Sequence, residues 1–276
     1  MPRRHTSSRL RIVAGILVVL LVGAGVLIWA VTSGGPGGPP KAAGAPCRVR
    51  DYGLDVAQAR NATTIAAVGK RLGMPDHAVS IALATAYLES NLHNIDFGDR
   101  DSLGLFQQRP SQGWGTPAQI LTPHYAAANF YRHLARVPGW QVIPVTEAAQ
   151  KVQRSALPDG YAQFEPAARA IAEALTGEVP AGLSCRVSFP AGPPPVGLQD
   201  AITTEIGIPS LSAPLDQSKG WTVSSWLVGH AEDFKIAAVT FGGQRWSAST
   251  GAWTPDPTVA MDLVGLNVSA AGVKSS

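Results

Sequence analysis

The chain has 276 residues, 45% of them hydrophobic and 15% charged, which allows one large domain or two small ones around a buried core. Of the formal net charge of +3, residues 1–45 supply +5 and hold no acidic residue, which leaves −2 for residues 46–276. This longer part has no basic stripe with interleaved aromatic residues, so the sequence argues against a nucleic-acid partner.

An uncharged apolar run of twenty residues, 12–31, follows Arg3, Arg4, Arg9 and Arg11. Its length is what a helix needs to cross a bilayer, and the preceding positive charge favours a cytoplasmic N-terminus. We therefore expect a cytoplasmic tail over residues 1–11, a transmembrane helix over 12–32 and an extracytoplasmic remainder, in a single-pass protein of the cell membrane. The alternative is a cleaved signal peptide, but its apolar region is shorter and ends at an Ala-x-Ala-like site that is not evident here.

Residues 33–46 are rich in glycine and proline, which predicts a linker between the membrane and the first domain. Cys47 follows the linker, and Cys185 is the second of only two cysteines. In an exported protein such a pair indicates a disulfide bond, with two unpaired thiols as the alternative. Two cysteines are too few for a thiolate zinc site.

Helical spacing of apolar residues predicts helices over residues 54–72, 76–90, 117–136, 145–154 and 166–175. Since no strand pattern interrupts them, we expect a mostly α domain over residues 47–186. A proline-rich segment at 189–195 then indicates a boundary. Beyond it we expect a helix over 215–234, strands over 236–241 and 259–264, and a turn at Gly242–Gly243 into residues 244–247. These elements predict a small α+β domain over residues 187–276.

The helix predicted over residues 76–90 ends in Leu88-Glu89-Ser90, and a polar loop then leads to Ser102 and the sequence Gly-Leu-Phe-Gln-Gln over 104–108. A carboxyl group at the end of a core helix is partly desolvated, which raises its pKa toward the range of a general acid near neutrality. Glycosidases prepare their catalytic acid in this way.

A Glu-Ser pair followed by Gly-Leu-Phe-Gln resembles the lysozyme-like soluble lytic transglycosylase family, over roughly residues 47–185, in a variant typical of actinobacterial and phage proteins. The resemblance implies a lysozyme-like fold with Glu89 as catalytic acid/base and the Gly-Leu-Phe-Gln segment lining a glycan cleft. The expected substrate-binding residues are Ser90, Ser102, Gly104, Phe106, Gln107, Gln108 and Trp114. The Tyr-Asn-Ala-Gly segment that the family often carries is missing, and residues 147–161 occupy that region.

A second carboxylate for hydrolysis would come from Asp96, Asp99 or Asp101, in the loop after Glu89. Lytic transglycosylation needs none, because the C6 hydroxyl of the sugar attacks and the same glutamate serves as acid and base. The sequence shows no metal-binding histidine pair and no phosphate-binding loop, so no metal or cofactor is expected. We therefore expect a membrane-anchored enzyme that cleaves peptidoglycan glycan strands. The alternative is a non-catalytic cell-wall-binding or scaffold protein.

Overall fold

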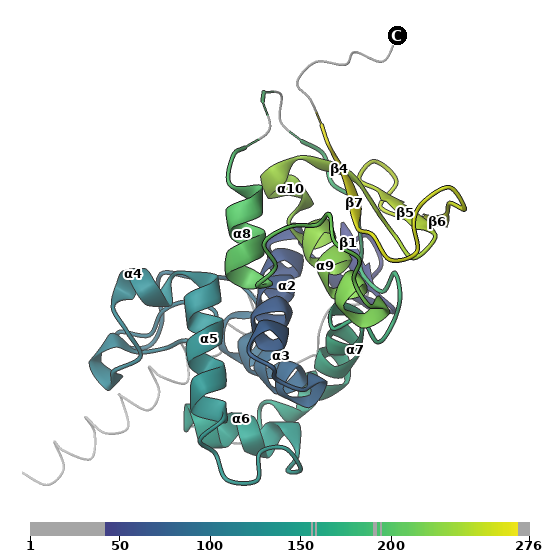
Figure 1. Ribbon diagram of the computed structural model, residues 1–276. Helices are drawn as coiled ribbons and strands as arrows, with labels where there is room; N and C mark the ends of the chain where they lie inside the picture. The colour runs from purple at the N-terminus through teal and green to yellow at the C-terminus, as the bar shows by residue number, and fades with distance from the viewer. Residues whose placement is uncertain (1–41, 156, 158, 190–191, 194, 270–276) are drawn as a thin grey trace, which may run out of the picture. The chain divides into compact units, whose positions relative to one another are not determined.

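The computed structural model describes residues 42–155, 157, 159–189, 192–193 and 195–269 (Figure 1). The predicted transmembrane helix over residues 12–32 and the tail before it lie outside this range. Among the residues that are described, no helix has the length and apolar character that a membrane span requires.

The structure is about 44% helical and has two small antiparallel sheets. The helices are α2 (Val56–Arg71), α3 (Asp76–Ser90), α4 (Pro117–Ile120), α5 (Pro123–Leu134), α6 (Val145–Gln153), α7 (Glu165–Leu175), α8 (Leu198–Glu205), α9 (Gln217–Gly229) and α10 (Ala231–Phe234). Single 3-10 turns span Pro110–Gln112 and Ala162–Phe164. The strands are β1 (Cys47–Val49), β2 (Tyr52–Leu54), β3 (Ser184–Cys185), β4 (Ile236–Phe241), β5 (Gln244–Ser247), β6 (Trp253–Pro255) and β7 (Gly265–Val268).

Helix α2 is the central element, and it contacts α3, α5, α7 and α9 (Figure 1). It begins at a capping box, in which the Asp55 carboxylate accepts from the Gln58 amide and Gln58 Oε1 accepts from the Asp55 amide. Its middle turns carry mostly small residues, nearly all of them buried, and small side chains let neighbouring helices approach closely on several sides. The helix predicted over 54–72 is thus present with boundaries two and one residues shorter.

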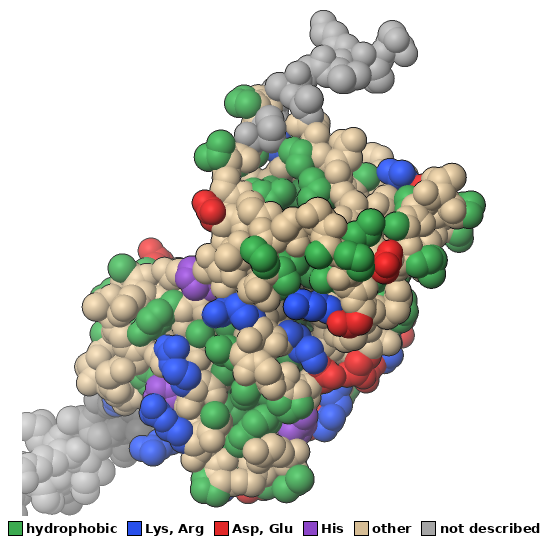
Figure 2. Space-filling model, viewed as in Figure 1, with side chains coloured by type: hydrophobic (Ala, Val, Ile, Leu, Met, Phe, Trp, Pro, Cys, Tyr) green, Lys and Arg blue, Asp and Glu red, His purple; other side chains and the backbone are tan. Residues whose placement is uncertain are grey.

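The single helix predicted over residues 117–136 is two helices in the structure, α4 and α5. Pro123 is the first residue of α5, and because proline has no backbone N–H it suits a helix start rather than a helix interior. Thr116 caps α4 by accepting from the Gln119 amide. Figure 2 shows blue (Lys or Arg) and purple (His) side chains on the part of the surface where Figure 1 draws α5.

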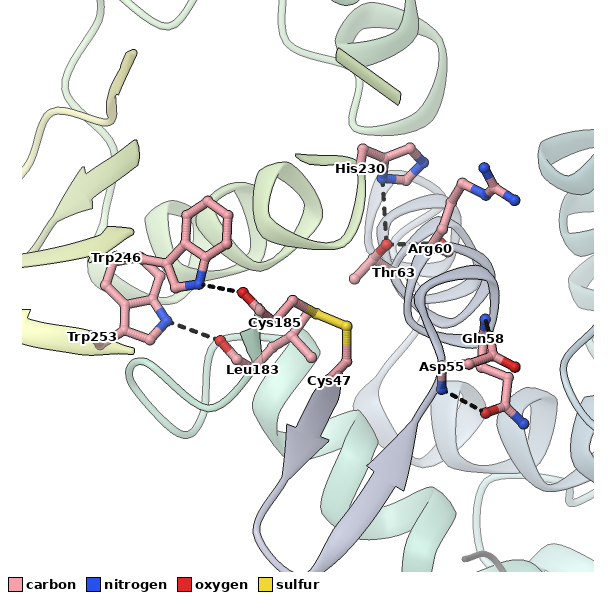
Figure 3. The surroundings of a disulfide bond; sticks show 10 residues. All are labelled: Cys47, Asp55, Gln58, Arg60, Thr63, Leu183, Cys185, His230, Trp246 and Trp253. Atoms are coloured by element: carbon pink, nitrogen blue, oxygen red, sulfur yellow. Dashed lines mark hydrogen bonds between the residues drawn. A yellow bond between two sulfur atoms is a disulfide. The ribbon is translucent and has the colours of Figure 1, made fainter. Parts of the chain in front are cut away.

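As predicted, no strand among the described residues lies between α2 and α7, but an unpredicted three-stranded antiparallel sheet, in the order β2-β1-β3, is formed by segments that precede and follow these helices. Its strands have three, three and two residues, which is too short for an alternating pattern to stand out in the sequence. Cys47 and Cys185 are register partners across β1 and β3, and they form the predicted disulfide bond (Figure 3).

The second sheet has the order β6-β5-β4-β7. The structure confirms the predicted strand over 236–241 and the turn at Gly242–Gly243 into β5. The strand predicted over 259–264 was wrong, since the strand that pairs with β4 begins at Gly265. Helix α8 was not predicted; it has only eight residues, of which Ile202 alone is buried.

Packing continues across the boundary predicted at residue 187. Trp246 and Trp253, from the second sheet, donate to the carbonyls of Cys185 and Leu183 at 3.1 and 2.9 Å (Figure 3). Helix α9 lies against α2 and α7, and Gly229 faces Thr63 so closely that an added Cβ would lie 2.5 Å from the threonine hydroxyl. The described residues therefore form one compact unit with a continuous core.

Candidate functional site around Glu89

Glu89 lies in the last turn of α3, where the backbone leaves the helix abruptly. Asn91 and Leu92 both have left-handed backbone, with φ of 52° and 60°, and their amides donate to the carbonyls of Tyr87 and Ala86. These bonds satisfy carbonyls that a helix end would otherwise leave unpaired. The buried Leu92 side chain fixes the exit path, so the position of the Glu89 carboxyl group is set by the core.

The Glu89 side chain is half-buried, and burial is the largest influence on its pKa, which it raises. Hydrogen bonds from Tyr161 and Gln153 act in the opposite direction without cancelling the shift. The negative end of the α3 dipole also disfavours a carboxylate at this position. A carboxyl group with a raised pKa keeps a proton that it can donate closer to neutral pH.

Tyr161 is the closest polar neighbour, and its Oη donates to Glu89 Oε1 at 2.8 Å. The ring is fully buried just before α7, and burial together with the nearby carboxylate raises the pKa of the phenol. Tyr161 therefore stays protonated and acts as a neutral donor. Gln153, at the end of α6, donates to the carbonyl of Phe106 at 2.7 Å and so connects Glu89 to the Gly-Leu-Phe-Gln segment.

Ser90 attaches the end of α3 to that segment. Its buried hydroxyl donates to the carbonyl of Leu105 at 2.8 Å and to that of Ala86 at 3.1 Å. Gly104 has φ of 73°, and an added Cβ would lie 2.8 Å from the carbonyl oxygen of Ile120, so the turn requires glycine here. The two predicted site segments, 89–90 and 104–108, are thus brought together.

The predicted substrate-binding residues differ in how much surface they expose. Phe106 is fully buried and stacks on Phe130, with ring centroids 4.7 Å apart. Gln108 is also buried, donates to the carbonyl of Ala126, and has no partner for its Oε1. Ser102 is buried as well. Of the polar side chains in this segment, Gln107 is the more exposed, and its Nε2 donates to the carbonyls of Phe97 and Gly104.

A cavity of about 630 Å³ opens beside this constellation. Trp114 lies on one side and stacks on His133, with ring centroids 3.9 Å apart. Gln153 lies on another side, so the residue that hydrogen-bonds Glu89 also borders the cavity. The lining residues are Gln112, Trp114, His133, Arg136, Val137, Lys151, Val152, Gln153 and Arg154.

The acidic loop gives Glu89 no carboxylate partner among the described residues. Asp101 is held by Arg109, at 2.8 Å, and by the amide and hydroxyl of Ser111, at 2.8 and 3.0 Å. These bonds hold the Asp101 pKa well below its usual range. Asp96 and Asp99 are exposed. The Glu89 pKa is shifted by burial of the carboxyl group and by two neutral neighbours, Tyr161 and Gln153.

Tyr161 and Gln153 were not among the predicted site residues, because they lie 72 and 64 positions after Glu89 and no local pattern marks them. Within the described part of the chain, no cluster of three or more His, Cys, Asp or Glu side chains is placed to hold a metal ion. A scan against protein-family models finds no match for the chain, and a search of curated proteins finds no similar sequence.

Proposed function

We propose that the protein is a membrane-anchored, extracytoplasmic enzyme that cleaves the glycan strands of peptidoglycan, with Glu89 as general acid and base. The observation that carries this proposal is the Glu89 carboxyl group itself. It is half-buried, has a raised pKa and accepts a hydrogen bond from the neutral donor Tyr161, and Gln153, which also influences its pKa, borders a cavity. A glycosidase requires a proton donor near a space that is large enough for a sugar ring.

In the reaction that we propose, protonated Glu89 donates to the glycosidic oxygen as the C1–O bond breaks. The C6 hydroxyl of the same sugar then attacks C1, and Glu89 takes the hydroxyl proton, which leaves a 1,6-anhydro product and the original protonation state. Transglycosylation is favoured over hydrolysis because none of the described acidic side chains pairs with Glu89 to activate water or act as nucleophile. Trp114 would provide an aromatic face beside the cavity for a sugar ring.

The test is to incubate the full-length protein with purified peptidoglycan and to identify released fragments by mass spectrometry. Glu89→Gln is the diagnostic variant, and Glu232→Gln, an exposed residue on α10, is the control with the same chemical change. Anhydro-muramyl products that Glu89→Gln abolishes and Glu232→Gln retains would support a lytic transglycosylase. Reducing-end products would indicate a muramidase. Retained sedimentation onto the wall without release by either form would indicate a non-catalytic binding protein instead.

A further inference from the structure

The cavity that Gln153 borders is lined by several basic residues. Arg136, Lys151 and Arg154 line it, together with His133, and none of its lining residues is acidic. Arg136 and Arg154 are exposed, and no described carboxylate forms an ion pair with either. Lys151 does pair with Glu147 on α6, at 3.4 Å, but both side chains are about half exposed, so water screens this pair. The cavity therefore has an excess of positive charge.

The fold itself brings these cations together. Arg136 follows α5, whereas Lys151 lies on α6, and the two helices contact each other. Arg154 ends α6 in a left-handed conformation with φ of 53°, and its amide donates to the carbonyl of Gln150 at 2.8 Å. Like charges from separate elements repel when they face one cavity, so this placement costs stability unless an anion occupies the space between them.

We propose that this cavity is a subsite for the carboxylate groups of the peptide stems that branch from the glycan strand. The inference rests on the proposed function, and it specifies the substrate. The sugar rings themselves are largely neutral and require hydrogen bonds and an aromatic face, not three cations. Free carboxylates on the peptides are the anionic groups attached to the same polymer, and guanidinium groups bind carboxylates through paired hydrogen bonds.

Because of where the cavity lies, binding of a peptide stem there would determine which glycosidic bond is cleaved. Gln153 contacts both Glu89 and the cavity, so a stem held by Arg136 and Arg154 would place its own sugar next to the acid. Trp114 and His133 form an aromatic wall on which the apolar parts of the peptide or the sugar can lie. A subsite of this kind increases the residence of stem-bearing strands over strands whose stems are neutral.

The experiment uses the full-length protein carrying Glu89→Gln, which separates binding from cleavage. Its probe is a soluble disaccharide-peptide fragment of peptidoglycan, compared with the same fragment after its carboxylates have been converted to amides. We expect the charged probe to bind about tenfold more tightly, as for two partly exposed ion pairs. Adding Arg136→Gln and Arg154→Gln should remove this preference, and 0.5 M salt should reduce it.

The matched control is Arg71→Gln with Lys219→Gln, which removes two positive charges from a different basic pocket, between α2 and α9. This control should keep the preference for the charged probe. Equal binding of the two probes, or loss of the preference in the control as well, would overturn the subsite. Tighter binding of inorganic phosphate than of the charged probe would also overturn it, in favour of a phosphate site.

The two proposals fail in different ways. If protein with Glu89 intact releases no fragment from peptidoglycan while the Arg136 and Arg154 effect on binding persists, cleavage is wrong and the subsite holds on a binding protein. If cleavage depends on Glu89 while both probes bind alike, the subsite is wrong and the enzyme remains. Cleavage rates on native and carboxyl-amidated peptidoglycan provide the corresponding comparison for an active enzyme.

Discussion

Glu89 and Glu205 occupy the same local position in two helices, but their surroundings differ. Each is in the last turn of its helix, α3 or α8, and each accepts a hydrogen bond from a buried aromatic side chain. Tyr161 donates to Glu89 at 2.8 Å, and Trp226 donates to Glu205 at 2.7 Å. Local structure alone therefore does not distinguish the carboxyl group that we propose as the acid from one that only connects helices.

The rest of the surroundings separates them. Glu205 also accepts from Thr64, at 2.8 Å, and faces His230, whose Nε2 lies 3.8 Å away. These contacts join α8 to α2 and α9, and the Glu205 side chain is only 13% exposed. Burial lowers the pKa of His230, which stacks on Trp226. Glu205 thus connects three helices, whereas the neighbours that influence the Glu89 pKa are two neutral side chains, one of which, Gln153, borders a cavity.

The largest effect should come from Glu89→Gln. The amide keeps the shape of the side chain but has no proton to donate, and general acid catalysis contributes about 10²–10⁴-fold to rate. We expect the rate of glycan release to fall by about that factor while the circular dichroism spectrum stays native. Measuring release by quantitative mass spectrometry checks this, and a variant that retains more than about a tenth of the rate would remove Glu89 from the chemistry.

Removing the disulfide should have the next largest effect, on stability. Cys47 and Cys185 close a loop with a sequence separation of 138 residues, and loss of such a bond costs about 2–5 kcal/mol. Urea unfolding of the Cys47→Ser, Cys185→Ser double variant measures the change. Because the core is continuous on both sides of the bond, we expect one lower transition. Two separate transitions would mean that the Glu89 and Glu205 regions unfold independently.

Glu205→Ala should cost less, about 2 kcal/mol, because it leaves the buried donors of Trp226 and Thr64 without an acceptor. The effect should appear as a lower urea midpoint, with the rate of glycan release per folded molecule unchanged. Glu205→Gln, which keeps an acceptor oxygen, should recover much of the loss. A variant that lost activity without losing stability would place Glu205 in the functional site.

These two glutamates also show what the sequence can and cannot predict. Glu89 was predicted because the helix end, the Glu-Ser pair and the Gly-Leu-Phe-Gln segment lie within twenty residues of one another. Glu205 was missed for two reasons. It ends α8, a helix that was not predicted, and its partners Thr64 and Trp226 come from α2 and α9, with Thr64 more than a hundred residues away in the sequence. The same limit hid Tyr161 from the predicted site.

For the fold as well, the elements that depend on local sequence patterns were predicted, and those that depend on distant contacts were not. Long helices such as α2 and α3 follow from continuous stretches of apolar and small residues, and the β4–β5 hairpin follows from its strand pattern and its two glycines. The sheet of β1, β2 and β3 depends on pairing between residues 47–54 and 184–185, which no local pattern encodes. Packing across residue 187 likewise depends on contacts that only the tertiary structure forms.

The smallest effect should be the most specific, a dependence of the free energy of unfolding on pH that Glu89 causes. Burial raises the pKa of Glu89 in the folded protein above its value in the unfolded chain. The stability that goes with the protonated form is then fully present below the unfolded pKa, about 4.3, and is lost as pH rises through the folded pKa. Glu89→Gln cannot ionise, so it should melt at a higher temperature than the wild type at pH 7.5, and this gain should vanish near pH 4.

Thermal unfolding of both proteins at the two pH values checks the sign of this difference in melting temperature. A gain of equal size at both would mean that glutamine packs better and that ionisation of Glu89 costs the fold nothing, whereas the expected difference would show that the protein gives up stability to keep an acid beside the cavity.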